Sequence, residues 1–267
     1  MPEQPPFPPE VQAFLGEIYR VTMPKQGATS QVWIVECAAG MRVVKHASRV
    51  PYVDWLIQEE FMLLVLWHWA VRRKFTVPIP DLFFVGGTSH EPYLIMSWLP
   101  GEPLATVMTR EDDPTRRLDW MSAFGKILRQ IHDTPVPEEL LHGASWLDER
   151  LNTAADYIRA GFELDAEDPP KLLELLQTNR PAPVPETLIH GDFMWDNVLV
   201  EDGRITGIID WGGGAFGDPR YDLALAILPH EDGEISAAEV NAFYEGYGCE
   251  PLSDSDYHYF INLYGFF

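Results

Sequence analysis

Cysteine is scarce in this chain of 267 residues, which has only Cys37 and Cys249. Two cysteines so far apart, without the short spacing of a metal knuckle, exclude a disulfide framework and a cysteine-based zinc site. Long apolar runs are lacking as well, because residues 61–71 are interrupted by His68 and are too short to cross a bilayer. The first ten residues show neither the basic nor the apolar part of a signal peptide. We therefore expect a soluble, cytoplasmic protein without a membrane partner.

Positive charge is also in short supply, since 19 Lys and Arg oppose 41 Asp and Glu, giving a formal net charge of -22. Residues 1–100 are almost balanced at -1, whereas residues 101–185 carry -7 and residues 186–267 carry -14. Such a field repels nucleic acid and concentrates cationic ligands. A solvated acidic surface that only aids solubility explains the same numbers. The charge disfavours DNA and RNA as partners but does not identify a substrate.

Apolar residues make up 46% of the chain, enough for one large domain or two closely packed lobes. The first part reads as strand, strand, helix, strand, strand, a pattern that predicts a small α+β lobe over residues 1–100. We expect an extended proline-rich start, Asp54 as the N-cap of the helix, and a turn at Gly86 and Gly87. The predicted elements are an antiparallel hairpin of 31–36 and 41–46, a helix of about 54–73, and strands 82–85 and 93–98.

The remainder, residues 101–267, predicts a mainly helical lobe with a short β insert. The expected helices are 115–133, 146–161, a short one from Pro169, 222–228 and 236–246, and the strand-loop-strand insert is 187–210.

Polar residues of one chemical kind gather in two nearby segments. The first is HGDFMWDNVLV, residues 190–200, and the second is IIDWGGGAFGDPRYDLA, residues 208–224. Phosphoryl transfer needs a carboxylate that accepts the proton of the acceptor hydroxyl, which Asp192 can supply. It also needs hard oxygen ligands for Mg²⁺, and Asn197 and Asp210 offer an amide oxygen and a carboxylate. A turn at 201–204 folds the intervening strands back so that these two can share one metal.

These segments resemble the aminoglycoside phosphotransferase and choline kinase family, which has a protein-kinase-like fold. The shared pattern HGDxxxxN, IIDW and GDPxxDLA agrees in both order and spacing. The resemblance implies a bilobal α+β kinase that uses ATP and Mg²⁺. By this resemblance Asp192 and His190 are the catalytic residues, with the histidine supporting the loop, and Asn197 and Asp210 are the metal ligands. Asp222 matches an acid that braces the backbone of that loop.

Lys45 ends an alternating strand, where its ammonium can reach the α and β phosphates of a nucleotide. Its partner should be a carboxylate on the following helix. Glu59 and Glu60 are adjacent and point about 100° apart, so only one can face the lysine. We predict that Glu60 pairs with Lys45, because Glu60 precedes the apolar segment FMLLVL as the corresponding glutamate of the family does.

Two further segments are predicted to touch the nucleotide. The loop KQGATSQVW, residues 25–33, holds a single glycine, and Gly27 and Ser30 can contact phosphate through the backbone and a hydroxyl. The stretch PYLIMSWLPG resembles the strand and hinge beside the adenine, which places Ser97, Trp98 and Leu99 at the base. The choice between ATP and GTP stays open.

The acceptor is expected to be a small molecule with a hydroxyl group and a positive charge, such as an aminoglycoside, bound by acids from residues 101–185 and 231–256. Choline, homoserine, a sugar or a macrolide fits the same catalytic residues.

A nucleotide-binding regulator without catalysis is another class of protein to consider, as is a kinase whose acceptor pocket is partly missing. Met194 and Trp195 border the acceptor or pack in the core. We expect a monomer or homodimer.

Overall fold

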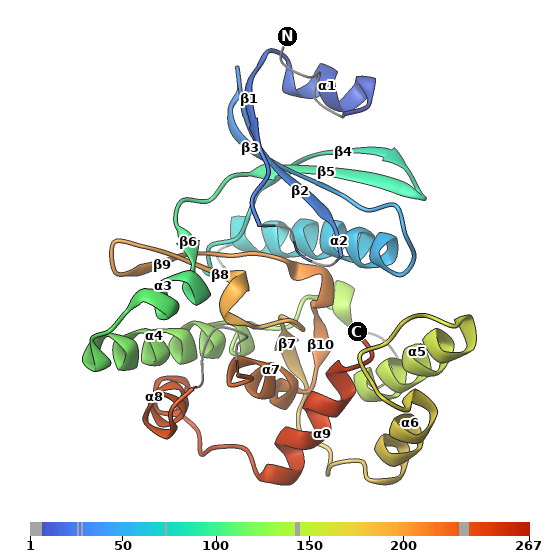
Figure 1. Cartoon of the computed structure of the whole chain (residues 1–267), viewed down its shortest axis with the longest axis vertical. Coiled ribbons are helices and arrows are strands. Elements are labelled where there is room, and N and C mark those ends of the chain that lie inside the picture. The colour runs from blue at the N-terminus through green and yellow to red at the C-terminus, as the bar shows by residue number, and fades with distance from the viewer. Residues whose placement is uncertain (1–6, 26, 28, 73, 142–144, 230–234) are drawn as a thin grey trace.

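A five-stranded antiparallel sheet forms the upper lobe in the computed structural model, which describes residues 7–25, 27, 29–72, 74–141, 145–229 and 235–267 (Figure 1). The strand order is β1-β2-β3-β5-β4. The predicted hairpin is confirmed, with Gln31 opposite His46 and Cys37 opposite Gly40. The strands are β1 (Ile18–Thr22), β2 (Gln31–Cys37), β3 (Gly40–His46), β4 (Leu82–Thr88) and β5 (Glu91–Ser97).

Helices α1 (Pro9–Leu15) and α2 (Tyr52–Val71) accompany this sheet. The prediction of an extended N-terminal segment was wrong from Pro9 onward, because Pro9 begins α1 and proline fits the first turn of a helix. Residues 1–6 of that segment lie outside the described part. Asp54 is not a cap either: α2 begins two residues earlier, and Asp54 lies in its first turn, where a carboxylate favours the helix dipole. Gly86 and Gly87 lie within β4, and the turn follows at residues 89–90.

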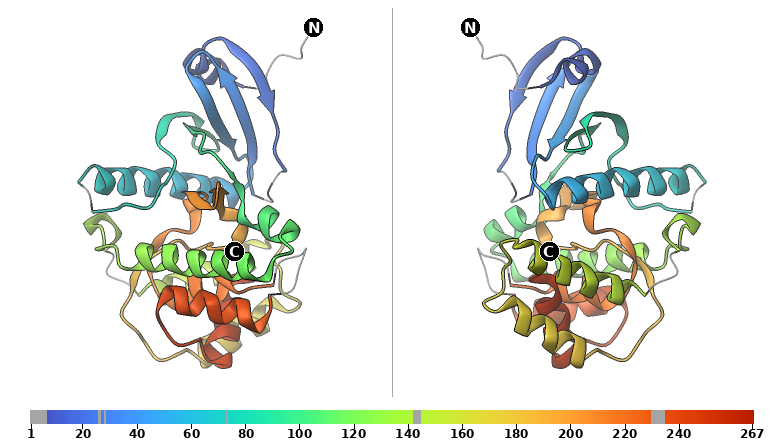
Figure 2. Two further views of the ribbon diagram at one scale, coloured as in Figure 1. Left: turned by 90° about the vertical axis from the view of Figure 1, so that its left-hand side faces the viewer. Right: turned by 90° about the vertical axis from the view of Figure 1, so that its right-hand side faces the viewer.

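The lower lobe is mainly helical, as predicted, and Figure 2 shows it beneath the sheet from both sides. Two short sheets lie within it, β6-β8-β9 and β10-β7. Helix α3 and strand β10 were not predicted, and of α9 only the part from Phe260 onward has a sequence that looks helical. The helices are α3 (Leu104–Arg110), α4 (Pro114–His132), α5 (Trp146–Ala160), α6 (Pro169–Thr178), α7 (Pro219–Ala226), α8 (Ala237–Tyr247) and α9 (Asp254–Tyr264). The strands are β6 (Glu102–Pro103), β7 (Thr187–Ile189), β8 (Val198–Glu201), β9 (Arg204–Ile208) and β10 (Ala215–Gly217).

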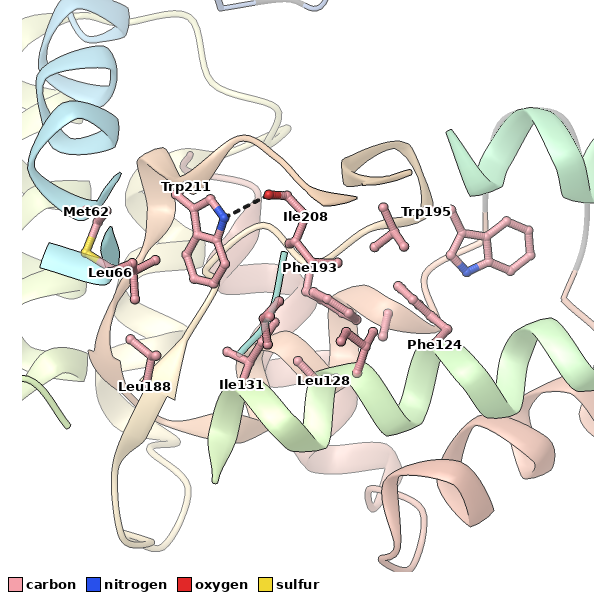
Figure 3. Close-up of a cluster of buried hydrophobic side chains, with 14 of the residues drawn as sticks. Met62, Leu66, Phe124, Leu128, Ile131, Leu188, Phe193, Trp195, Ile208 and Trp211 are labelled. Carbon is pink, nitrogen blue, oxygen red and sulfur yellow. Dashed lines mark hydrogen bonds between the residues drawn. The ribbon is translucent and has the colours of Figure 1, made fainter. Parts of the chain in front are cut away.

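The largest apolar cluster joins α2, α4 and the segment around residues 188–211 (Figure 3). Phe193 stacks on Phe124 of α4 with ring centroids 4.5 Å apart. Trp211 is fully buried and donates its indole N–H to the carbonyl of Ile208 at 3.1 Å. Close packing of large rings leaves little room for movement. The backbone on either side of Asp192 and Asp210 is therefore anchored in the core.

Trp195 takes the second of its two expected positions. It lies 6% exposed in the same cluster, on the side near Phe124 (Figure 3). Met194 packs against a second cluster that includes helices α5, α7 and α9. Within the described part of the chain, every helix is too short or too polar to cross a membrane.

Candidate active site

Asp192 lies between β7 and β8, in a loop whose shape depends on glycine. Gly191 adopts a left-handed φ of +79°, and a Cβ there would lie 2.0 Å from the carbonyl oxygen of Gly213. Only glycine permits both this conformation and this close approach of two chains. The loop that carries Asp192 is thereby held against residues 211–213, which follow Asp210.

Asp222 braces the backbone of this loop. Its two carboxylate oxygens accept hydrogen bonds from the N–H groups of His190, at 2.7 Å, and Gly191, at 2.8 Å. His132 lies 3.1 Å from the same carboxylate and 2.8 Å from the hydroxyl of Tyr247. A fully buried carboxylate is tolerated because both oxygens are satisfied. The geometry agrees with the bracing role that the resemblance implied for Asp222.

His190 is fully buried and supports the Asp192 loop through hydrogen bonds of its ring. Its Nδ1 accepts a hydrogen bond from the N–H of Asp192 at 3.2 Å, so Nε2 carries the proton and donates to the carbonyl of Ile209 at 3.0 Å. Burial lowers the pKa of His190, although Asp222 opposes that shift. The ring is therefore a neutral support that ties the Asp192 loop to the residue before Asp210.

The Asn197 amide orients Asp192. Its nitrogen donates to both the carbonyl and the Oδ2 atom of Asp192, each at 2.8 Å. Among the described residues, none donates a hydrogen bond to the amide oxygen of Asn197. Asp210 has a left-handed backbone, with φ +66°, and a partly exposed side chain. Left-handed non-glycine residues are held by surrounding structure and are often functional.

These two side chains fit a magnesium ion. The described residues contain no group of three or more His, Cys, Asp or Glu that could hold a metal by themselves. Mg²⁺ does not need one, because it is bound by one or two protein oxygens together with nucleotide phosphates and water. The carboxylate of Asp210 and the free amide oxygen of Asn197 are such a donor pair.

Lys45 is buried in β3 and bonds to Glu59, with its Nζ 2.8 and 2.9 Å from the two carboxylate oxygens. The prediction of Glu60 was therefore wrong. Glu60 lies one residue along α2, rotated by about 100°, and is only half-buried. Lys45 also lies 3.2 Å from Asp210. Burial alone would lower the pKa of Lys45, but Asp210 and Glu59 outweigh it, so the ammonium stays charged.

The carboxylate of Asp192 is more basic than an ordinary aspartate. Burial and the nearby charge of Asp210 raise its pKa to about 7, while hydrogen bonds from Asn197 and Tyr264 oppose the shift. A general base is most effective when its pKa lies near the working pH. Asp192 can thus accept a proton from a hydroxyl group held at its surface.

The predicted nucleotide contacts are only partly available. Ser30 lines the cavity beside Asp192, and Gly27 is exposed; residues 26 and 28 lie outside the described part. The N–H of Ser97 is already bound to the carbonyl of Asp81 at 2.9 Å, so it is not free for an adenine. Trp98 and Leu99 follow β5, and their main-chain groups make no hydrogen bond with another described residue. We therefore still expect the main-chain groups of Trp98 and Leu99 to contact the adenine.

A cavity of about 210 Å³ opens between Asp192, Asp210 and helix α2. Much of its wall is aromatic, with Tyr52, Trp55, Tyr221, Tyr264 and Phe267. Contrary to the expectation, none of the described acids of 101–185 and 231–256 lines this cavity; residues 231–234 lie outside the described part. From those ranges the cavity receives only Arg150.

Sequence reasoning missed the part of the site that comes from α9, α5 and the start of α2. Tyr264 donates its hydroxyl to Oδ1 of Asp192 at 3.1 Å. Trp55 donates its indole N–H to the hydroxyl of Tyr157 at 3.0 Å, joining α2 to α5. No spacing rule relates these residues to the catalytic motif. Glu59 was also beyond sequence reasoning, because α2 is apolar on several faces and only the structure shows that position 59 shares the buried face with Leu56, Leu63 and Leu66.

The model of the phosphotransferase enzyme family matches residues 21–258, which is most of the chain. The chain belongs to this family. It is therefore a phosphotransferase that acts on hydroxyl groups of small molecules, and the predicted kinase-like bilobal fold is confirmed.

Relatives within the phosphotransferase enzyme family differ in their acceptors. The chain is 27% identical over 208 residues to an aminoglycoside 3'-phosphotransferase of Streptomyces fradiae, covering 72% of this chain and 74% of that protein. It is 25% identical over 245 residues to a homoserine kinase of Rhizobium rhizogenes, covering 84% and 72%. A solved aminoglycoside-3'-phosphotransferase of type VIII shares its fold, with a TM-score of 0.79, 24% identity and 97% coverage of both chains.

Proposed function

We propose that this protein transfers the γ-phosphoryl group of ATP, with Mg²⁺, to a hydroxyl group of a small molecule. The observation that carries this proposal is the position of Asp192 between an amide and a carboxylate that suit a metal, next to a buried lysine. Asn197 bonds to Asp192 at 2.8 Å, and Asp210 lies 3.2 Å from Lys45. Asp192 and Asp210 line one cavity, Asn197 contacts the first and Lys45 the second, so base, metal ligands and phosphate-binding cation adjoin the same cavity.

Each residue has one task in this reaction. Asp192 orients the acceptor hydroxyl and takes its proton as the oxygen attacks the γ-phosphorus. Lys45, held by Glu59, neutralises the α and β phosphates. Asn197 and Asp210 would hold Mg²⁺, which would neutralise negative charge on the nucleotide phosphates. Most of the rate gain comes from placing these charges before the reaction.

A cationic acceptor such as an aminoglycoside is the first candidate for the substrate. The net charge of -22, concentrated after residue 100, favours the approach of a polycation. The aminoglycoside phosphotransferases among the relatives support the same choice. In this proposal the acids act by attraction over a distance, because the described acids of the lower lobe do not line the cavity.

An amino acid with a hydroxyl side chain, such as homoserine, is the second candidate, and Arg150 favours it. Arg150 lines the cavity, lies 5.1 Å from the ring centre of Phe267, and has no ion pair with another described residue. Its Nε atom is buried without a hydrogen-bond partner in the described part. A buried guanidinium nitrogen without a partner is costly unless a ligand satisfies it, and a carboxylate would do so.

The first test measures ADP release from Mg-ATP against aminoglycosides, homoserine, choline, sugars and a macrolide. Strong stimulation by one acceptor class is expected. Tight Mg-ATP binding without stimulation would direct the search to other acceptors, and absence of nucleotide binding would overturn the proposal.

Arg150→Gln separates the two candidates. If homoserine is the acceptor, this change should raise its KM at least about tenfold, because a charged hydrogen bond is lost. An aminoglycoside should bind as well as before, or better. Arg159→Gln is the matched control, since Arg159 lies on the same helix and pairs with Asp156 on the exposed side.

A further inference from the structure

The base of this enzyme is already hydrogen-bonded to a hydroxyl group. Tyr264, at the end of α9, donates to Oδ1 of Asp192 at 3.1 Å. The other oxygen, Oδ2, accepts from Asn197 at 2.8 Å. Both oxygens of the carboxylate are therefore engaged, one by a residue five positions away and one by a residue 72 positions away.

The phenol is a neutral donor at any working pH. Burial and the charge of Asp192 raise the pKa of Tyr264 far above its ordinary value. It lies at the cavity wall beside Tyr221, with ring centroids 6.3 Å apart, and α9 packs against α7. The ring is thus held on its apolar side, while the hydroxyl faces the base. A water molecule or an alcohol would present the same kind of O–H donor to Asp192.

We propose that Tyr264 occupies the place of the acceptor hydroxyl in the resting enzyme, and that this keeps water from being activated until the acceptor displaces it. The inference rests on the proposed kinase function. Oδ2 accepts the hydrogen bond from Asn197 and Oδ1 lies on the side of the cavity-lining Tyr264, so the proposal places the acceptor hydroxyl at Oδ1. Tyr264 acts through Asp192 and is a positioning residue.

The chemistry explains why such a device is useful. In transfer, the acceptor oxygen forms a bond to the γ-phosphorus, the bond from that phosphorus to the bridging oxygen breaks, and its electron pair leaves with ADP. The acceptor proton goes to Asp192. Water at the same position would undergo the same steps and give ADP and inorganic phosphate. Active sites commonly exclude water to suppress such side reactions.

Tyr264→Phe tests the inference, because it removes the hydroxyl and keeps the ring. ATP hydrolysis without acceptor should rise at least about fivefold, since general-base assistance to water becomes available. The affinity for Mg-ATP should stay within about twofold. The ratio of ATP consumed to acceptor phosphorylated should increase. A purely structural role would lower hydrolysis and transfer together, along with Tm.

Tyr257→Phe is the matched control, because Tyr257 lies on the same helix and packs against the second apolar cluster. It should leave hydrolysis unchanged. Equal or slower hydrolysis in Tyr264→Phe would overturn the inference while leaving the kinase function intact if the unmodified enzyme still phosphorylates its acceptor. Phosphate found on Tyr264 by mass spectrometry after incubation with Mg-ATP would also overturn it, because the phenol would then be an acceptor.

Discussion

Asp192 combines a raised pKa with a fixed orientation. Burial removes the water that would stabilise the charged form, and Asn197 and Tyr264 fix the carboxylate plane by one hydrogen bond to each oxygen. A carboxylate in this state is a stronger base than one in water and pays little to reach the reactive geometry.

Replacing Asp192 by Asn keeps the size of the side chain and removes its ability to take a proton. We expect kcat to fall by about 10²–10⁴-fold, the range for loss of a general base. The Kd for Mg-ATP should change by less than about twofold, because Lys45 and Asp210 are untouched. Steady-state kinetics and calorimetry measure the two quantities, and an unchanged kcat would contradict the role assigned to Asp192.

Glu59→Gln should lower kcat/KM for ATP by about 10–100-fold, because it leaves the buried ammonium of Lys45 paired only with Asp210. Glu60→Gln makes the same chemical change on a half-buried position one residue away. It should keep kcat/KM within about twofold. Kinetic assays of both variants with increasing ATP compare them directly, and equal losses would show that Glu59 has no special place.

The Glu59 and Glu60 pair shows what a motif can and cannot predict at the residue scale. The resemblance predicted a glutamate on this helix but did not separate two neighbours. The spacing of the leucines did not separate them either, because Leu63 and Leu64 are equally apolar and only the structure shows that Leu63 is buried and Leu64 exposed. The choice between the two glutamates therefore depends on which face of α2 the fold buries.

At the scale of elements, the hairpin β2–β3 and the long helices α2, α4 and α5 could be predicted because their patterns are regular over many residues. The prediction of a turn at Gly86 and Gly87 was wrong, because glycine also occurs inside strands and β4 continues past both residues. Short elements such as α3 and β10 depend on contacts with distant segments. Their sequences alone carry too little signal.

Helix α8 is fixed to the fold by its first turn. Ser236 and Glu239 form a reciprocal capping box, and Glu239 also bonds to Arg117 of α4 at 2.5 Å. Burial would raise the pKa of Glu239, but the bonds from Ser236 and Arg117 outweigh it, so the pKa lies below the ordinary value. The ionised form is therefore stabilised in the folded protein.

Because the folded pKa of Glu239 is depressed, its contribution to stability is present above the unfolded pKa and is lost as the pH falls through the folded pKa. Glu239→Gln should lower the free energy of unfolding by about 1 kcal/mol at pH 7. The difference from the unmodified protein should shrink below about pH 4.5. Urea denaturation at several pH values measures it. Glu245→Gln, on the exposed side of α8, is the control and should show no such trend.

At the scale of the whole molecule, the aromatic wall of the cavity beside Asp192 could not be predicted because it is assembled from distant segments. Tyr264 meets Asp192 across 72 residues, and Trp55 meets Tyr157 across 102. The catalytic and metal-binding candidates were easier to predict, since Asp192, Asn197 and Asp210 are close in sequence. The catalytic motif therefore predicts the reaction, whereas the substrate depends on tertiary structure.

The hydrogen bond between Trp55 and Tyr157 joins α2 of the upper lobe to α5 of the lower lobe, beside the cavity that Trp55 lines. Trp55 lies one helical turn before Glu59 on α2, so if nucleotide binding displaces Lys45 and Glu59, the cavity wall at Trp55 moves with them. The two substrates are then thermodynamically linked, and each must change the affinity of the other by the same factor. Trp55→Phe should bring that factor closer to one. Calorimetric titration of a non-hydrolysable ATP analogue with and without acceptor, and of acceptor with and without the analogue, would measure this reciprocity from both sides.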